Sequence, residues 1–238
     1  MQLYVKLDHV AGLRSAGGGR EPEPSIAASL AELEGAKGIT LHLHSDRATV
    51  QLRDIRVLLE TLSIPLNLEL SISTKNRQHA FDLRPAAITL VREPMDVKAD
   101  RWPLEVEDKG GVASFIEALK EADIRAGVMI RPEIDAVRWA HKIGAQIIVI
   151  DTTSYAMAKT ITEQTAQIAR LTDCVKLGGK LGLETHASGG INTRNLGELA
   201  RLRFAVVHIG HALVARALLV GMSRAVRDII EQIEKESA

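Results

Sequence analysis

The chain has 238 residues, and its 30 basic and 30 acidic side chains leave no formal net charge at pH 7. This balance argues against a nucleic-acid or membrane-surface partner, and an aromatic content of only 3% argues against a surface that stacks bases. Cys174 is the only cysteine, so no intrachain disulfide can form and a reducing compartment is expected. Because neither a signal peptide nor a membrane-spanning apolar run is visible, we expect a cytoplasmic protein without a membrane partner.

Eight short apolar runs, each typical of a buried strand, follow one another along the chain. They are centred on Leu3–Leu7, Ile39–Leu43, Leu66–Leu70, Ala87–Val91, Ala126–Ile130, Ile147–Ile150, Gly182–Thr185 and Ala205–Ile209. Between them, apolar residues recur at helical spacing, as at Ile26, Leu30 and Leu33 and again from Met222 to Ile233. Eight strands that alternate with helices predict one α/β domain, residues 1–238, folded as a closed (β/α)8 TIM barrel.

In several of these runs, alternate positions near the C-terminal end carry ionisable side chains. The side chains concerned are Lys6, Asp8, His42, His44, Glu69, Glu184, His186 and His208. An ordinary core does not repeatedly point such groups inward, because each must lose its water and then find a partner. A barrel explains the pattern, since one face of each strand meets the helices and the other meets a polar mouth that holds the active site.

Two glycine-containing turns follow the seventh and eighth runs. They are Ser188-Gly189-Gly190-Ile191 and Ile209-Gly210-His211-Ala212, and the second opens a helix. Glycine lets backbone N–H groups approach an anion closely, and the start of a helix adds a favourable dipole. TIM barrels often bind phosphate in these two places, so we predict phosphate-binding loops after strands seven and eight. The alternative is that the glycines only make tight turns between strand and helix.

These and further segments resemble the pyridoxine 5′-phosphate synthase family. The segments that carry the resemblance are Lys6-Leu7-Asp8-His9, Leu13-Arg14, Gly38–Leu43, Asp46-Arg47, Arg53–Arg56, Asn67-Leu68-Glu69 and Ile209–Ala212. They fall in the family's order, and the resemblance runs almost from end to end. It implies a phosphate-binding barrel that assembles into a homo-octamer and needs no cofactor. It also implies a reaction that condenses 1-deoxy-D-xylulose 5-phosphate with an amino-acetone phosphate, closing a pyridine ring and releasing phosphate and water.

The resemblance assigns roles to individual residues. His42 corresponds to the family's general base, and Glu69 corresponds to its catalytic carboxylate. The family's contacts to sugar phosphate and phosphate correspond to Asp8, His9, Gly190, Gly210 and His211.

Other positions depart from the family's pattern. Lys6 stands where the family has a substrate-binding Asn, and His44 stands where it has an Arg. Gly17 takes the place of a binding Arg, whose role Arg20 fills if it reaches across the neighbouring glycines. Arg14 and Arg20 flank this glycine triplet, and they either close over a second anionic group or belong to a surface loop. Lys6, His44 and Arg20 are therefore further candidates for substrate binding.

The family's proton-donating His is replaced by Gly189. His186 lies three residues earlier on the same strand and should point inward, so it is a candidate for a relocated acid. A structural pair between His186 and Glu184 is the alternative interpretation. His208, on the neighbouring strand, is a second candidate for the acid.

Other functions remain open besides pyridoxine 5′-phosphate synthesis. One is a lyase or condensing reaction on another phosphorylated keto compound, in which Lys6 forms a Schiff base. A Lys6 that only neutralises Asp8 or Glu69 is the simpler interpretation. Another is a non-catalytic paralogue that binds a phosphorylated metabolite without turnover. A third is a metal-assisted reaction, in which His42, His44, His186 and His208 hold a divalent transition metal.

Overall fold

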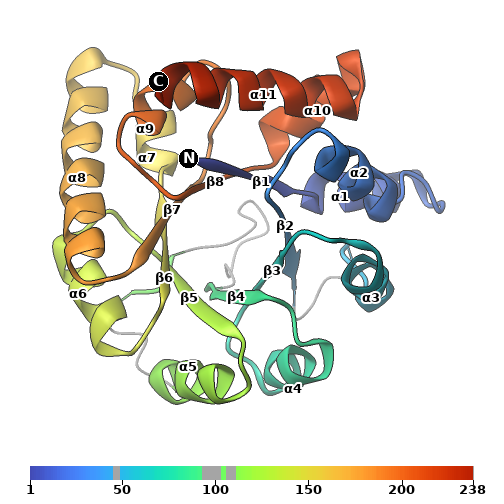
Figure 1. Ribbon diagram of the computed structural model, residues 1–238, viewed down its shortest axis with the longest axis horizontal. Helices are drawn as coiled ribbons and strands as arrows, with labels where there is room; N and C mark the ends of the chain where they lie inside the picture. The colour runs from blue at the N-terminus through green and yellow to red at the C-terminus, as the bar shows by residue number, and fades with distance from the viewer. Residues whose placement is uncertain (45–48, 93–102, 106–110, 238) are drawn as a thin grey trace.

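A closed barrel of eight parallel strands forms the centre of the molecule, with β1 bonded to β8 (Figure 1). The computed structural model describes residues 1–44, 49–92, 103–105 and 111–237. The strands are β1 (Gln2–Lys6), β2 (Gly38–Leu43), β3 (Leu66–Leu70), β4 (Ala87–Leu90), β5 (Arg125–Ile130), β6 (Ile147–Asp151), β7 (Glu184–Ser188) and β8 (Val206–Ile209). This arrangement confirms the predicted TIM barrel. The segment Asp46-Arg47 of the resemblance lies outside the described residues.

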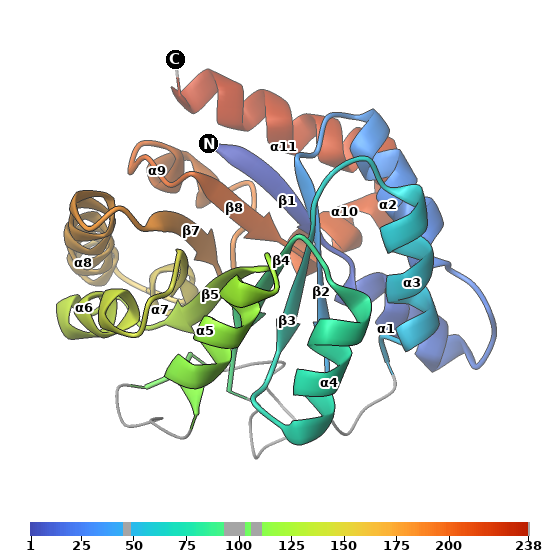
Figure 2. The same cartoon turned by 60° about the horizontal axis from the view of Figure 1, so that its bottom comes forward.

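Helices surround the barrel on its outer side (Figures 1 and 2). They are α1 (Asp8–Gly17), α2 (Pro24–Leu33), α3 (Leu52–Thr61), α4 (Thr74–Leu83), α5 (Val112–Glu121), α6 (Ile134–Lys142), α7 (Thr153–Ala156), α8 (Ile161–Lys180), α9 (Leu196–Ala200), α10 (His211–Val220) and α11 (Met222–Ser237). Among the described residues, no helix combines the length and the apolar character needed to cross a membrane.

The main core lies between the outer face of the barrel and the helices. Side chains such as Val5, Leu41, Leu68 and Ile148 are fully buried there. Burial of one such side chain is worth about 1.5–3 kcal/mol, so this layer accounts for much of the stability of the fold. The inner face of the barrel is consequently free to carry polar groups.

The inside of the barrel is divided into two halves of different polarity. On β4 to β6, an apolar cluster is formed by Ala87, Val91, Met129, Ile147 and Val149. The strands on the opposite side of the barrel contribute buried polar side chains, namely Lys6, Thr40, His42, Glu69, His186 and His208. The inward-pointing ionisable groups predicted from the sequence are therefore concentrated on one side of the barrel.

Strand β7 begins two residues later than the predicted run Gly182–Thr185. Helix α8 continues to Lys180, and the chain then reverses at Gly182, which has a positive φ of 74°. The backbone N–H of Leu183 still bonds to the carbonyl of Gly178, so the ladder starts only at Glu184. This shift places His186 in the middle of β7.

Helix α1 was not expected from the sequence, which suggested a loop around the glycine triplet. It starts directly after β1 and ends at Gly18, whose φ of 65° allows its N–H to bond to the carbonyl of Ser15. Its Arg14 is buried and makes two short bonds, of 2.7 and 2.6 Å, to the carboxylate of Asp54 on α3. Arg14 therefore joins α1 to α3, and the idea that it closes over an anionic substrate group is wrong.

Helix α2 is present where the spacing of Ile26, Leu30 and Leu33 predicted a helix, but that apolar stripe does not face the core. Ile26 is 63% exposed and Leu33 is 81% exposed. The buried face consists mainly of alanines, which let α2 pack closely against α3 and α11. Ile26 and Leu30 instead line a surface groove of about 530 Å³ between α2 and α10.

Candidate active site

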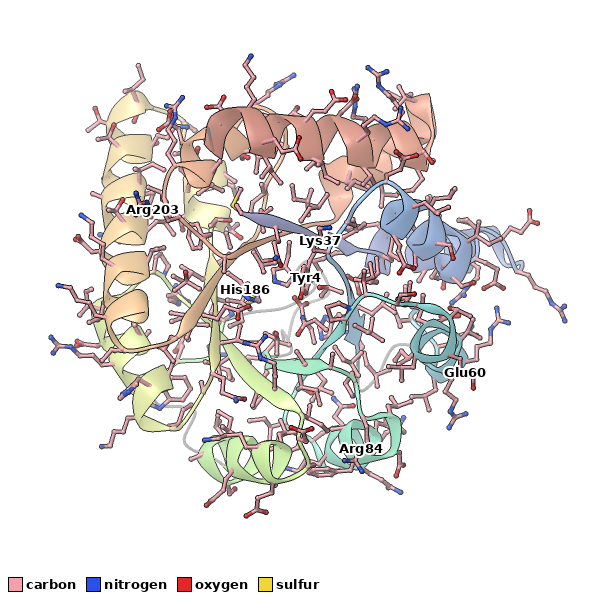
Figure 3. The ribbon with its side chains drawn as sticks, in the orientation of Figure 1. Tyr4, Lys37, Glu60, Arg84, His186 and Arg203 are labelled. Atoms are coloured by element: carbon pink, nitrogen blue, oxygen red, sulfur yellow. The ribbon has the colours of Figure 1, made fainter. Side chains whose placement is uncertain are left out.

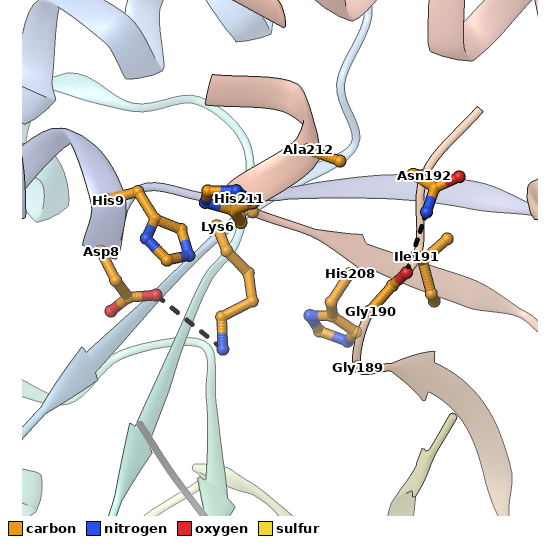
Figure 4. Close-up of a pocket in the computed structure, with 11 residues that line it drawn as sticks. Lys6, Asp8, His9, Gly189, Gly190, Ile191, Asn192, His208, His211 and Ala212 are labelled. Atoms are coloured by element: carbon orange, nitrogen blue, oxygen red, sulfur yellow. Dashed lines mark hydrogen bonds and ion pairs between the residues drawn. The ribbon is translucent and has the colours of Figure 1, made fainter. Parts of the chain in front are cut away.

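A pocket of about 310 Å³ opens at the carboxyl ends of β1, β7 and β8 (Figure 4). It is lined by Lys6, Asp8, His9, Gly189, Gly190, Ile191, Asn192, His208, Gly210, His211 and Ala212. Six of the residues singled out as binding candidates from the sequence are among them: Lys6, Asp8, His9, Gly190, Gly210 and His211. The pocket lies where TIM barrels bind phosphate, between the turns that follow strands seven and eight.

The two glycine turns form one wall of this pocket. Gly210 immediately precedes α10, and a β-carbon at this position would lie only 3.0 Å from Cβ of Lys6. The other turn is braced by Asn195, whose side-chain amide donates to the carbonyl of Gly190 at 3.0 Å. The absence of side chains at these positions brings backbone N–H groups and the start of α10 to the surface of the pocket, an arrangement suited to an anion.

Lys6 occupies the floor of the pocket between two carboxylates. Its Nζ lies 2.5 Å from Oε2 of Glu69 and 3.8 Å from Oδ2 of Asp8. Lys6 is 4% exposed and Glu69 is completely buried. The geometry corresponds to the simpler interpretation of Lys6, in which it neutralises the neighbouring carboxylates.

His42 and Glu69 are direct neighbours in the register of β2 and β3, and both are buried in the polar half of the barrel. The backbone N–H of His42 donates to Oδ1 of Asp8 at 2.6 Å, which ties the start of α1 to β2. The ring of His42 stacks on that of His44 at a centroid distance of 3.8 Å. His42 and Glu69 are not among the residues that line the pocket, and Lys6 links Glu69 to it.

His186 lies below the pocket, inside the barrel. Its Nε2 is 2.7 Å from Oε1 of Glu184, and its Nδ1 is 3.0 Å from Nε2 of His208. The pairing with Glu184, one of the two interpretations of His186, is thus present. The pocket itself is lined by His208, which was the second candidate for the acid.

Electrostatics at this end of the barrel follow from the same contacts. The hydrogen bond from His186 lowers the pKa of Glu184 to about 2, with Arg125 adding to the effect. Burial lowers the pKa of His186 below its usual value, because the charged imidazolium loses its water. Glu184 is therefore ionised at neutral pH and accepts the proton that His186 carries on Nε2.

Gly189 sits in a turn that does not accommodate a side chain. Its φ is 118°, and a β-carbon there would lie 2.6 Å from both Oδ1 of Asp151 and Oγ1 of Thr153. Those two atoms are hydrogen-bonded to each other, so they are held in place. The position that the resemblance assigns to the family's His therefore has a backbone shape that only glycine adopts readily.

The remaining binding candidates, Arg20 and His44, lie apart from the pocket. Arg20 is exposed beyond the end of α1, and it is not among the pocket-lining residues. His44 follows β2, its ring lies against that of His42, and it is not among the pocket-lining residues. Beyond the strand ends of β4 and β5, Arg92 and Arg131 both bind Glu105, at 2.9 and 3.2 Å.

Two features of the site were missed from the sequence. Asn192 lines the pocket after the Gly189–Ile191 turn, and its position two residues beyond Gly190 was the only signal for it. Thr40 donates or accepts a bond of 2.9 Å with Nδ1 of His208, and nothing in the local pattern distinguishes it from other strand threonines.

The four histidines considered for a metal separate into two pairs. His42 stacks on His44, whereas His186 and His208 are bonded to each other, to Glu184 and to Thr40. In the part of the chain that the structure describes, no three His, Cys, Asp or Glu side chains are grouped so that they could hold a metal ion.

Comparison with known proteins gives a consistent result. The chain matches the family model described as "Pyridoxal phosphate biosynthesis protein PdxJ" over residues 3–235. It is 38% identical over 235 residues to pyridoxine 5′-phosphate synthase of Geobacter metallireducens, covering 98% of both chains. It is also 38% identical over 229 residues to the enzyme of that name from Syntrophotalea carbinolica, covering 95% of this chain and 96% of the relative.

Solved structures with low sequence identity support the fold alone. A thiamine phosphate pyrophosphorylase from Pyrococcus furiosus superposes with a TM-score of 0.66 at 14% identity, covering 100% of this chain and 97% of that one. A phosphoribosyl anthranilate isomerase from Thermus thermophilus gives a TM-score of 0.61 at 15% identity, with 99% of both chains covered.

Proposed function

Because this chain belongs to the PdxJ family of pyridoxal phosphate biosynthesis proteins, we propose that it condenses 1-deoxy-D-xylulose 5-phosphate with an amino-acetone phosphate. It is a pyridoxine 5′-phosphate synthase-like enzyme, and the product is pyridoxine 5′-phosphate. The observation that carries the proposal is the position of the pocket. Its two glycine turns and its inward charges meet at the carboxyl end of the barrel, where a phosphorylated substrate fits.

The phosphate of the sugar substrate binds against Gly190, Gly210 and His211. Backbone N–H groups at the start of α10 donate to its oxygens, and the helix dipole favours the negative charge. His9 and His211, whose rings lie 5.1 Å apart edge to face, border the same anion. Asp8 and Lys6 face the hydroxyl and carbonyl groups of the substrate.

His42 acts as the general base, and Glu69 assists enolisation and loss of water. The register of β2 and β3 supports this pairing, because it places both side chains on the same inward face. The proton donor that replaces the family's His is His208 in this proposal, since His208 lines the pocket and His186 lies beneath it. His186 therefore acts on the substrate only through His208.

A Schiff-base lyase is the second candidate, because Lys6 is a buried amine that lines the pocket. Such an amine must lose its proton before it attacks a keto group, and the carboxylate of Glu69 at 2.5 Å favours the ammonium form. Borohydride reduction in the presence of the keto substrate distinguishes the two functions. We expect no covalent adduct at Lys6, whereas a lyase of this kind would be trapped.

We propose that the enzyme is a cytoplasmic homo-oligomer, an octamer, that needs no metal or organic cofactor. The exposed leucines of α10 and the groove beside α2 support an interface between copies, because isolated chains rarely expose so many large apolar side chains together. Dialysis against a chelator followed by metal analysis tests the cofactor statement. We expect the rate to be unchanged after all metal has been removed.

The reaction is tested by supplying the protein with both substrates and measuring pyridoxine 5′-phosphate by mass spectrometry. We expect product from the wild-type enzyme and a rate lower by about 10²–10⁴ for His42→Asn, because the general base is lost. His141→Asn is a matched control, since His141 is an exposed histidine on α6. Binding of the sugar phosphate without any product would refute the synthase function and favour the non-catalytic paralogue.

A further inference from the structure

A chain of hydrogen bonds runs through the polar half of the barrel. Oε1 of Glu184 lies 2.7 Å from Nε2 of His186, and Nδ1 of His186 lies 3.0 Å from Nε2 of His208. Nδ1 of His208 lies 2.9 Å from Oγ1 of Thr40. Figure 3 shows His186 and Tyr4 at the centre of the barrel, between the surrounding strands.

The two ends of this chain differ in their surroundings. Glu184 is the first residue of β7, so it lies at the amino end of the barrel, and its side chain is 33% exposed beside Arg125. His186 and His208 are only 4% and 2% exposed. At the other end, His208 lines the pocket between the ammonium end of Lys6 and the Gly189–Gly190 turn (Figure 4). The bonds thus connect the pocket with water on the opposite face of the molecule.

The ionised carboxylate of Glu184 determines which atom donates in each hydrogen bond of this row. Glu184 only accepts hydrogen bonds at neutral pH, so His186 carries its proton on Nε2 and presents a lone pair at Nδ1. Nε2 of His208 must then donate to that lone pair, which leaves Nδ1 of His208 as an acceptor for the hydroxyl of Thr40. Both rings are neutral in this state, and burial favours the neutral form of His186.

We propose that Glu184, His186 and His208 form a proton relay between the active-site pocket and solvent at the amino end of the barrel. The proposal rests on the synthase function, in which His208 is the catalytic residue and the other two are positioning residues. When the hydroxyl of Thr40 takes a proton from the pocket side, it gives its own proton to Nδ1 of His208, and the Nε2 proton of His208 passes to Nδ1 of His186. The Nε2 proton of His186 then passes to Glu184 and leaves to water, so one proton enters and one leaves.

The reverse sequence returns a proton to the pocket. Water protonates Glu184, the two rings exchange their tautomers, and Nδ1 of His208 gives its proton to the hydroxyl of Thr40, which releases its own proton toward the pocket. Enolisation and dehydration both require a group that gives and takes protons, and the relay lets one buried ring do both without keeping a charge. It also replaces the function of the side chain that is missing at Gly189.

The charged and titratable groups around the relay are compatible with this role. Tyr4 from β1 lies edge-on to the ring of His208 and tilted against that of His186, and burial raises the pKa of Tyr4 so that it stays neutral. Arg125 from β5 binds Glu184 at 2.7 Å and lowers the pKa values of both Glu184 and His186. Lys6 from β1 is the cation that shares the pocket with His208, and its charge is balanced by Glu69.

Kinetics of Glu184→Gln test the relay in the intact enzyme. Glutamine keeps the size of the side chain, but its amide can accept from or donate to Nε2 of His186 and does not take up the proton. We expect kcat to fall by about 10² with unchanged KM values. Glu198→Gln, at an exposed surface carboxylate bonded to Arg201, is the matched control. An unchanged kcat for folded Glu184→Gln would overturn the relay.

Arg125→Met provides a second test, because Arg125 binds Glu184 and is not among the residues that line the pocket. Loss of its charge raises the pKa values of Glu184 and His186, so the acid limb of the kcat profile should move to higher pH. If Glu184 and His186 had a purely structural role, the acid limb would not move. A kcat–pH profile of Arg125→Met identical to that of the wild type would therefore contradict the relay.

A measurement independent of turnover is ¹⁵N NMR of the histidine rings, assigned with His186→Gln and His208→Gln. At neutral pH we expect both rings to be neutral with the proton on Nε2, and we expect Glu184→Gln to change the tautomer mixture of His208. An imidazolium, or a proton on Nδ1 of His208 in the wild type, would refute the relay. If the wild type makes no pyridoxine 5′-phosphate, the synthase function fails while this spectrum still decides the relay.

Discussion

Glu69 is completely buried and negatively charged, so it needs a nearby cation to balance its charge. Its Oε2 lies 2.5 Å from Nζ of Lys6, and the pair is held inside the barrel. A buried ion of this kind is stable only while its partner remains, because desolvation of one unpaired charge costs several kcal/mol. Glu69 therefore supports the ionisation of Lys6, in addition to the catalytic role proposed for it.

We predict that Glu69→Gln lowers kcat by about 10²–10⁴, since the carboxylate can no longer move a proton. The same change leaves the Lys6 ammonium without its nearest anion, so the melting temperature should also fall. Steady-state kinetics and thermal unfolding measure the two effects. Glu60→Gln, at an exposed carboxylate on α3, is the control and should change neither quantity.

The pH dependence of stability follows from two shifted groups. The pKa of Glu184 is lowered from 4.5 to about 2 in the folded protein, so its stabilising contribution is complete above pH 4.5 and is lost as the pH falls toward 2. The pKa of His186 is lowered from 6.5, so the unfolded state binds a proton first and stability begins to fall below pH 6.5.

Urea unfolding across this range checks both statements. We predict that the free energy of unfolding of the wild type decreases steadily from pH 6.5 to acid. The decrease should be smaller for Glu184→Gln, which has no carboxylate to protonate. If the free energy of unfolding fell equally steeply with pH below 4.5 in the wild type and in Glu184→Gln, the group with the lowered pKa would not be Glu184.

Among the structural elements, the turn between β7 and α9 limits which residue can stand at position 189 beside the pocket. Gly189 has a φ of 118°, and the hydrogen-bonded pair Asp151 and Thr153 occupies the space that a β-carbon would need. The family's His therefore cannot be restored by a single substitution. The proposed proton donor is therefore His208, which lies on the neighbouring strand β8 and lines the pocket.

We predict that Gly189→His does not increase the rate of product formation and lowers the melting temperature, because the turn must change shape. Gly182→Ala tests the effect of a positive φ alone, since nothing lies within 4 Å of a β-carbon at that position. A gain in rate for Gly189→His would show that the turn can reshape and that the family's donor position is still usable.

The order and type of the strands could be predicted from the sequence because each strand has a short apolar outer face. The inward positions of Lys6, His42 and Glu69 followed from the same alternation. The start of β7 could not be predicted, since it depends on where α8 ends and on the Gly182 turn. The local periodicity of the sequence does not show at which residue tertiary contacts end a helix or start a strand.

Side-chain partners were harder to predict than strand positions. Arg14 was considered as an anion-binding group, but the unexpected helix α1 turns it toward Asp54. The stripe on α2 was visible as a helical pattern, yet small alanines on the opposite face pack more closely against α3 and α11. Which face of a helix is buried depends on what its neighbours can accommodate, and that is a property of the whole fold.

At the scale of the whole molecule, the apolar side chains near the end of α10 are the clearest surface feature. Leu218 is 68% exposed and Leu219 is 85% exposed, and Leu218 borders the groove beside α2. Large apolar side chains on a surface are costly in water unless another surface covers them. A second copy of the chain is the proposed cover.

We predict that Leu219→Glu reduces the oligomer to smaller species, because a charge at this position must be desolvated in an interface. Sedimentation velocity of the wild type and the variant measures the change. Glu121→Gln, at an exposed position at the end of α5, should leave the distribution unaltered. A monomeric wild-type protein would contradict the proposed assembly.

We propose that this barrel closes a pyridine ring at a pocket built from Lys6, Asp8 and the two glycine turns. The most direct test is a ³¹P NMR time course of the wild-type enzyme with both phosphorylated substrates. We predict that inorganic phosphate and pyridoxine 5′-phosphate appear together in equal amounts as both substrate signals decline. Unchanged substrate signals, or phosphate released without pyridoxine 5′-phosphate, would contradict the account.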